Sequence, residues 1–307
     1  MVEYFRNLPC YRLSLACGDS VLIALQGAQV LSWVSQGRER LFLSPNNKFD
    51  GHTPIRGGVP ICFPQFNQRG PLPRHGFVRT MEWDAHDRVE SPDIAFQDFS
   101  CATQAHTLAH WEFQFVAQYR VEIEPGQLNL TLRVTNNDSN TLQFTGALHT
   151  YLAVDDIALT ELRGLDGLPE WDAVEDVHAI APPSLHFDGE FDRVYHAGDN
   201  ALHLQDGSSL LQIEQSPSWA HTVVWNPGAA GCAGMAGCGM GVLFPARSSD
   251  LGAKASALGA AGLSSTGIFT GGAPGFTIAL GASDGAACAD PRGLVMLSHA
   301  ACGVSEL

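Results

Sequence analysis

The chain has 307 residues, and its 17 lysines and arginines stand against 32 aspartates and glutamates, a formal net charge of −15. This acidic balance argues against nucleic-acid binding, which needs a basic face. No apolar run reaches the roughly 18 residues of a spanning helix, and the start lacks the layout of a signal peptide, so we expect no membrane partner and a cytoplasmic location. We also expect a monomer.

Short apolar segments separated by turn residues follow one another along the chain. In the first 45 residues they cover 21–25, 28–34 and 41–43. Residues 111–119 and 128–134 alternate apolar and polar side chains, which is typical of strands with one buried face. Helical periodicity is nearly absent. With no repeat and no linker in view, the pattern predicts a single all-β domain over residues 1–307, a sandwich or a barrel.

The eight cysteines are scattered, and none forms a C-x-x-C pair with another. A zinc site or a redox motif is therefore not expected. Free thiols in a reducing compartment are the simplest explanation. The sequence also gives no reason to expect another metal or an organic cofactor.

A basic cluster interrupts this acidic chain between residues 48 and 79. It holds five basic residues and one acid, Asp50. Its arginines are Arg56, Arg69, Arg74 and Arg79, and the guanidinium fork suits a phosphate or a carboxylate. The surrounding glycines and prolines favour fixed loops close to a ligand. On charge alone, a solvated basic loop stays possible.

The order of residues in this cluster resembles one particular family. The pattern I-R-G-G-V-P-I-C-F-P-Q-F, followed after a short insert by L-P-R-H-G-F-V-R and a tryptophan, is similar to the hexose-6-phosphate mutarotases. These form a branch of the aldose 1-epimerase family. Further similar segments are A-L-H-T-Y at 147–151, F-D-R-V-Y at 191–195 and T-V-V-W-N-P at 222–227. The resemblance covers about residues 10–236.

The resemblance implies a β-sandwich of the galactose-mutarotase type that interconverts the α and β anomers of a hexose 6-phosphate, most simply glucose 6-phosphate. His149 matches the general acid of the family, and His75 and Asp192 match residues that hold the sugar. Arg56 and Arg79, with Arg74 beside His75, match positions around the phosphate. Ring opening needs only an acid and a base at opposite ends of the O–C–O unit, so no cofactor is required.

Without the resemblance, purely structural roles remain open for several of these residues. His149 could be a hydrogen-bonded core histidine, because it lies in an apolar strand-like run. Asp192 could be a turn aspartate, and Arg69 could lie only at the rim. The other histidines lack a supporting motif.

The C-terminal segment departs from the family pattern. Residues 237–307 hold only seven of the 49 charged residues, with 14 glycines and 14 alanines. The family places its catalytic glutamate some 30 to 40 residues after the T-V-V-W-N-P motif, but here no glutamate follows Glu214 before Glu306. His221 also replaces the usual aspartate. We therefore expect residues 237–307 to be a mobile tail or a frame-altered segment that lacks the closing strands.

Three hypotheses follow from the sequence. The first is a mutarotase, and the second is a sugar-phosphate-binding protein that lacks a catalytic base. The third is a broken gene product that folds poorly.

Overall fold

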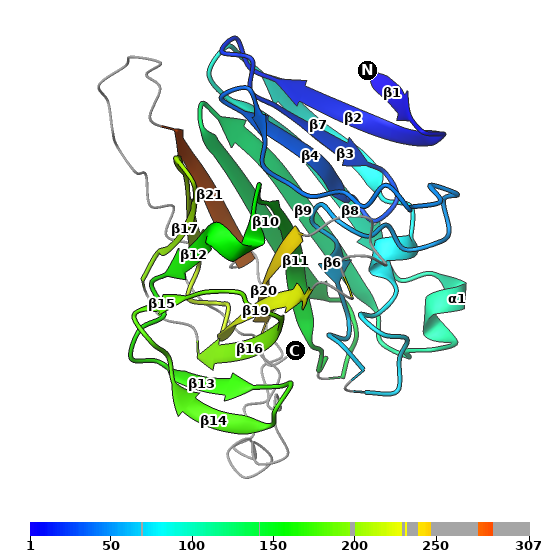
Figure 1. Cartoon of the computed structure of the whole chain (residues 1–307). Helices are drawn as coiled ribbons and strands as arrows, with labels where there is room; N and C mark the ends of the chain where they lie inside the picture. The colour runs from blue at the N-terminus through cyan, green and yellow to red at the C-terminus, as the bar shows by residue number, and fades with distance from the viewer. Residues whose placement is uncertain are drawn as a thin grey trace.

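The computed structural model describes residues 1–68, 70–140, 142–196, 200–228, 231, 239–246 and 276–284. Regular structure in this part of the chain is almost entirely β-strand, arranged in sheets of five, nine and seven strands (Figure 1). The predicted all-β sandwich is therefore confirmed. Within the described ranges, no helix has the length and apolar character needed to cross a membrane.

Each sheet is given in its spatial order. The five-stranded sheet is β1 (Val2–Phe5), β2 (Leu8–Ser14), β3 (Ser20–Ala24), β4 (Val30–Ser35) and β5 (Arg38–Glu39). The nine-stranded sheet is β15 (Ser184–Leu185), β12 (Thr160–Arg163), β17 (Leu202–Asp206), β18 (Ser209–Gln215), β21 (Phe276–Asp284), β10 (Gln127–Asn136), β9 (Phe115–Glu124), β8 (Ala95–Ala102) and β7 (Asp84–Glu90). The seven-stranded sheet is β14 (Val177–Ile180), β13 (Pro169–Asp172), β16 (Glu190–His196), β19 (His221–Pro227), β20 (Gly239–Ala246), β11 (Gly146–Ala153) and β6 (Ile61–Cys62). The helical turns are η1 (Val78–Thr80), α1 (Ala105–Leu108) and η2 (Ile157–Leu159).

The main hydrophobic core takes side chains from all three sheets. Trp33 of β4, Tyr119 of β9 and Leu148 of β11 are all buried in it. Burying one large apolar side chain contributes about 1.5–3 kcal/mol, so this shared core is what holds the layers together. The period-two pattern on which the strand predictions rest follows from it, because alternate residues of each strand face the core.

The C-terminal segment contains strands that the sequence did not predict. We expected residues 237–307 to lack the closing strands, but two described parts of it are central strands. β20 lies between β19 and β11, and β21 lies between β18 and β10. Ile278 and Leu280 of β21 are fully buried. Backbone pairing does not require charged side chains, so a segment almost without charge can still form central strands. The other residues of the segment lie outside the described ranges.

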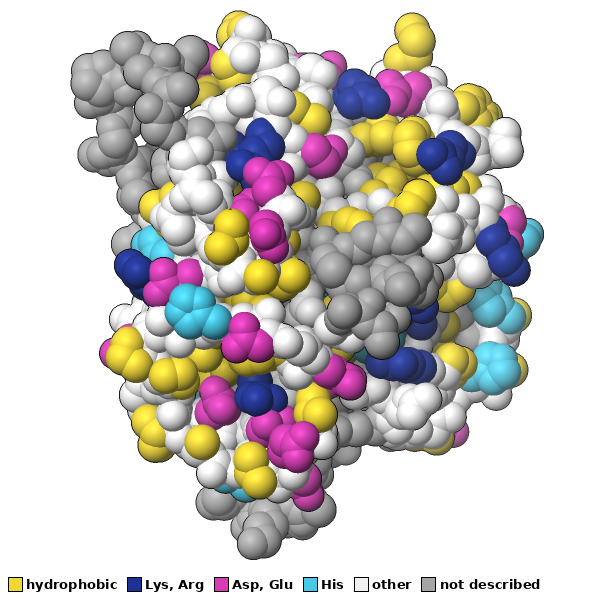
Figure 2. All heavy atoms as spheres, in the orientation of Figure 1, with side chains coloured by type: hydrophobic (Ala, Val, Ile, Leu, Met, Phe, Trp, Pro, Cys, Tyr) yellow, Lys and Arg dark blue, Asp and Glu magenta, His cyan; other side chains and the backbone are white. Residues whose placement is uncertain are grey.

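Acidic side chains dominate part of the surface. On the face shown in Figure 2 they gather in the lower left part of the molecule, where β13, β14 and β16 lie. That face shows no continuous basic stripe.

Candidate active site

Strand alternation gives the seven-stranded sheet two different faces. On β11, Leu148 and Leu152 enter the main core, so His149 and Tyr151 point to the opposite side. On β19, Val224 enters the core, so Trp225 also points to the opposite side. We call this opposite side the site face; it carries Cys62, Ala147, His149, Tyr151, Asp192, Val194, Val223 and Trp225.

Strand register brings the two halves of the site face together. Asp192 on β16 lies opposite Trp225 on β19, Trp225 lies opposite Gly241 on β20, and Gly241 lies opposite Tyr151 on β11. Because the strand between them contributes only a glycine at this row, the Tyr151 and Trp225 rings approach to 6.2 Å between centroids. β20 therefore joins the histidine side of the site to the aspartate side.

The first arginine loop runs along the edge of β11. The backbone N–H of Tyr151 donates to the Gly58 carbonyl at 2.9 Å, and that of His149 donates to the Pro60 carbonyl at 3.0 Å. At Gly58, where φ is +63°, an added Cβ would lie 2.0 Å from the Val30 carbonyl oxygen. The glycine is thus required for the chain to pass β4, and it fixes the loop that begins at Arg56 against the site face.

The second loop presents His75. Its backbone has φ +66°, and its Nδ1 accepts a hydrogen bond from the backbone N–H of Asn67 at 3.2 Å. A lone pair on Nδ1 places the proton of the neutral ring on Nε2. Burial, followed by the charges of Arg79 and Arg74, lowers the pKa of His75 to about 3. His75 is therefore a neutral hydrogen-bond donor through Nε2 at physiological pH.

His149 lies at the centre of an aromatic cluster. Its ring stacks on Tyr151 at 4.4 Å with an interplanar angle of 6°, and it lies edge-on to His75 at 5.7 Å between centroids. Its Nδ1 is buried and has no hydrogen-bond partner among the described residues. Burial, then His75 and Arg79, lower the pKa of His149 well below 6.5. A core histidine usually has a hydrogen-bond partner, so the unpartnered Nδ1 favours the prediction of a ligand-binding role.

The three predicted arginines lack carboxylate partners among the residues that the structure describes. The Arg79 Nη2 donates to the Arg74 carbonyl at 2.6 Å, directly before His75 in the chain, and its Nε is buried without a partner. Burial lowers the pKa of Arg79. Arg56 and Arg74 are exposed. Arg74 and Arg79 act on both histidines and Arg56 acts on Tyr151, so the three guanidinium groups suit an anion.

Asp192 lies in strand β16, not in a turn. Its side chain is partly buried, and burial followed by Glu190 raises its pKa, while Arg193 and Arg74 act in the opposite direction. It has no side-chain hydrogen bond in the described part of the chain. The carboxylate is thus free to accept a hydrogen bond from a ligand hydroxyl.

The structure brings together five of the six site residues that the sequence predicts, through the sheet register, the ring contacts and the Arg79 bond. Arg56 joins them through its loop, and Arg69 lies outside the described residues. Sequence reasoning missed Tyr151 and Trp225, although both lie in the quoted motifs. Tyr151 lies two residues after His149, and Trp225 lies two residues after Val223, so each shares a strand face with that residue. This spacing was the signal available in the sequence.

Three acids of the C-terminal segment, Asp250, Asp284 and Glu306, could in principle supply the missing base, but none is placed in the site. Asp250 and Glu306 lie outside the described residues. Asp284 ends β21 opposite Ser209, in the nine-stranded sheet and not in the sheet that carries the site.

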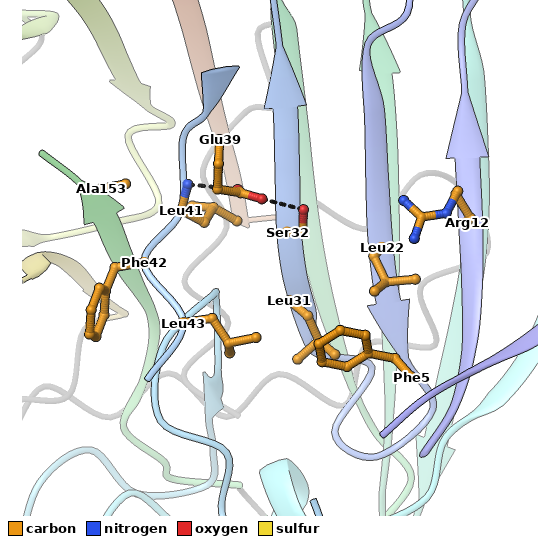
Figure 3. A pocket seen from close by; sticks show the side chains of 10 residues that line it. All are labelled: Phe5, Arg12, Leu22, Leu31, Ser32, Glu39, Leu41, Phe42, Leu43 and Ala153. Atoms are coloured by element: carbon orange, nitrogen blue, oxygen red, sulfur yellow. Dashed lines mark hydrogen bonds between the residues drawn. The ribbon is translucent and has the colours of Figure 1, made fainter. Parts of the chain in front are cut away.

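A hollow of about 410 Å³ lies elsewhere, beside β4 and the end of β11 (Figure 3). Leu22, Leu31 and Leu43 give it an apolar lining. Its carboxylate, Glu39, accepts hydrogen bonds from Ser32 and from the backbone N–H groups of residues 33 and 41, so it is fully engaged. The hollow contains none of the predicted site residues, and its apolar lining does not suit a sugar phosphate.

Solved structures share this fold. A protein of Salmonella typhimurium provisionally called a mutarotase superposes with a TM-score of 0.76 at 22% identity, over 92% of this chain and 93% of its own. Galactose 1-epimerase of Lactobacillus acidophilus gives 0.63 at 14% identity, over 92% and 97%.

Sequence relatives give the family. A profile of the family described as aldose 1-epimerase matches residues 9–250, which extends the resemblance beyond residue 236. Two proteins provisionally named glucose-6-phosphate 1-epimerase, from Cenchrus ciliaris and Escherichia coli, are each 34% identical, over 220 and 217 residues. Each match covers 67% of this chain, and 66% and 70% of those relatives. The chain belongs to the aldose 1-epimerase family.

Proposed function

We propose that this protein interconverts the α and β anomers of an aldohexose 6-phosphate, with glucose 6-phosphate as the first candidate. One observation supports the phosphate above all: Arg74 and Arg79 act on the histidine pair, Arg56 acts on the adjacent Tyr151, and none of the three has a carboxylate partner in the described chain. Arg79 is partly buried, and an uncompensated charge there is costly unless a ligand supplies the counter-charge. A phosphate dianion supplies it, whereas a neutral sugar does not.

The proposed reaction needs one proton to be removed and one to be delivered. A base takes the proton of the anomeric hydroxyl, His149 Nε2 gives a proton to the ring oxygen, and the bond between C1 and the ring oxygen breaks. The open aldehyde turns about C1–C2 and closes on its other face, with the protons returned. His75 and Asp192 hold the ring oxygens and hydroxyls through hydrogen bonds.

A bound phosphate also supports the role of His149 as an acid. Without a ligand, burial and the neighbouring positive charges keep the His149 ring neutral, because they lower its pKa. An anion against Arg74 and Arg79 offsets part of that positive field. The pKa of His149 then rises toward neutrality, where a general acid is most effective.

A second candidate function is binding of a sugar phosphate without catalysis. The sequence favours it in one respect: no glutamate lies between Glu214 and Glu306, where the family pattern requires its base. The described carboxylates on the site-face side of β16 are Asp192 and the exposed Glu190, and the proposal gives Asp192 a binding role. The two candidates share the binding site and differ only in turnover.

Two measurements separate these candidates. Polarimetry of freshly dissolved α-glucose 6-phosphate, with and without protein, reports mutarotation. Calorimetry with glucose 6-phosphate and glucose reports binding. Acceleration together with a preference for the phosphate supports the mutarotase, whereas binding without acceleration supports the second candidate. Equal affinity for glucose and its phosphate would overturn both.

A further inference from the structure

Tyr151 has a hydroxyl group that the proposed mechanism does not use. Its side chain is 8% exposed and belongs to the site face, where its ring stacks on His149 at 4.4 Å and lies edge-on to Trp225 at 6.2 Å. Buried tyrosine hydroxyls usually find a hydrogen-bond partner. The Tyr151 hydroxyl has none among the described residues, although its ring is held on both sides.

Backbone and ring contacts connect Tyr151 to the arginine loops. The Tyr151 backbone is bonded to Gly58, two residues after Arg56. His149, on which the Tyr151 ring stacks, contacts the His75 ring, and the Arg79 guanidinium is bonded to the residue before His75. Burial and then Cys62 raise the pKa of Tyr151 to about 12, while Arg56, Arg79 and Arg74 act in the opposite direction. The hydroxyl therefore keeps its proton at neutral pH and can donate it to an acceptor.

A comparison with Tyr119 shows that a missing partner is not sufficient evidence by itself. The Tyr119 hydroxyl also lacks a partner, but it is sealed inside the main core, and burial alone raises its pKa. The Tyr151 hydroxyl is not sealed in this way, and three arginines act on it. The two tyrosines thus separate a packing role from a binding role within one molecule.

From this arrangement we propose that the Tyr151 hydroxyl donates a hydrogen bond to the phosphate of the substrate, as a fourth donor beside Arg56, Arg74 and Arg79. The inference rests on the proposed function. The geometry of the ligand agrees with it, because only C5, C6 and O6 separate the ring oxygen from the phosphorus. A donor to the phosphate must then lie next to the acid that protonates the ring oxygen, and Tyr151 is stacked on His149.

The test compares Tyr151→Phe with Tyr119→Phe, two variants that each lose one unpartnered hydroxyl. Calorimetry would use glucose 6-phosphate, inorganic phosphate and glucose as probes. Because a hydrogen bond to a charged group is strong, Tyr151→Phe should weaken binding of both phosphates by about 10- to 100-fold, with glucose binding unchanged. Tyr119→Phe should bind all three probes like the wild type.

Steady-state kinetics give a second test of the same inference when the wild-type protein catalyses mutarotation. A contact to the phosphate is equally strong before and during ring opening, so Tyr151→Phe should raise KM and leave kcat nearly unchanged. Unchanged affinity for both phosphates in Tyr151→Phe would overturn the inference. A wild-type protein that does not prefer glucose 6-phosphate over glucose would instead overturn the phosphate assignment itself, whatever the variant does.

Discussion

Arginines have different surroundings in two regions of this molecule. Away from the site, Arg120 forms two hydrogen bonds with Asp98 at 2.7 Å. At the site face, Arg56, Arg74 and Arg79 have no carboxylate partner in the described chain. The charge of Arg120 is therefore compensated in the folded protein, whereas the site arginines leave their charge uncompensated.

This difference indicates which changes should affect stability and which should affect binding. A paired or packed group stabilises the folded protein, so its removal lowers the unfolding free energy even without a ligand. An unpaired group in the site costs stability or leaves it unchanged, and its contribution appears only when an anion is present. The predictions below use this contrast, beginning with the largest expected effect.

Replacing His149 by Asn should affect chemistry far more than folding. The amide keeps polarity and approximate size but cannot transfer a proton, so the mutarotation rate should fall by roughly 10²–10⁴. Binding of glucose 6-phosphate, measured by calorimetry, should persist. A rate equal to that of the wild type in polarimetry would remove His149 from the mechanism.

Replacing Ile278 by Ala should lower the stability of the protein and leave ligand binding nearly unchanged. Ile278 is fully buried in β21, so its truncation leaves a cavity in the main core and should cost about 2–5 kcal/mol of unfolding free energy. Denaturant titration measures this loss, and affinity for glucose 6-phosphate below the transition should stay close to the wild-type value. A change below about 0.5 kcal/mol would mean that β21 is not part of the cooperative core.

Replacing Arg56 by Ala should weaken binding of glucose 6-phosphate by about 1.5–3 kcal/mol, because a charge-assisted hydrogen bond to the phosphate is lost. Its unfolding free energy should hardly change, since Arg56 is exposed. The matched control is Arg120→Ala, which breaks an exposed ion pair worth at most about 1 kcal/mol and lies on another sheet. Similar binding by both variants would contradict the contrast drawn above.

The buried state of His75 makes a prediction about pH. Its pKa is about 3 in the folded protein against an ordinary 6.5, so below pH 6.5 the unfolded chain takes up a proton that the folded chain does not. His75 therefore costs no stability above pH 6.5, and its contribution falls by up to about 1.4 kcal/mol per pH unit between pH 6.5 and 3.

Denaturant titration of the wild type and of His75→Asn across this range checks the slope. The variant should lose stability less steeply than the wild type as the pH falls. His106→Asn, at an exposed position of α1, is the control. Parallel curves for wild type and His75→Asn would show that the ring is not held neutral.

Much of the fold could be predicted from the sequence because its strands alternate. The prediction over 128–134 corresponds to β10, and the one over 28–34 corresponds to most of β4. The predicted strand at 111–119 begins later, at Phe115, because residues 111–114 lie outside the ladder that pairs β9 with β8 and β10. Alternation reports a buried face and not the point at which pairing starts.

The C-terminal strands could not be predicted by the same rule. In β20, the letters G-M-G-V-L-F-P-A contain no polar residue, so no alternating pattern marks the strand. In β21, Phe276, Ile278 and Leu280 do alternate, but alanine and glycine among the intervening residues hide the contrast.

The residues of the candidate site could be predicted from the sequence, but the strand pairing that brings them together could not. The motifs pointed to His75, His149 and Asp192 as members of one site. No local pattern shows that Gly241 lies between Trp225 and Tyr151, since this row depends on pairing between strands far apart in the chain. Tyr151 was missed because its role depends on the missing partner of its hydroxyl, which only a folded structure can show.

The position of β20 has a consequence for synthesis on the ribosome. β11 ends at Ala153 and β19 ends at Pro227, yet the strand that joins them begins only at Gly239. Chains are made from the N-terminus at about 5–20 residues per second, so the second half of the site is synthesised about 0.6–2.4 seconds before the start of the strand that brings the two halves into register. A nascent chain stalled before Gly239 should therefore carry every binding side chain discussed above and still be unable to retain a sugar phosphate.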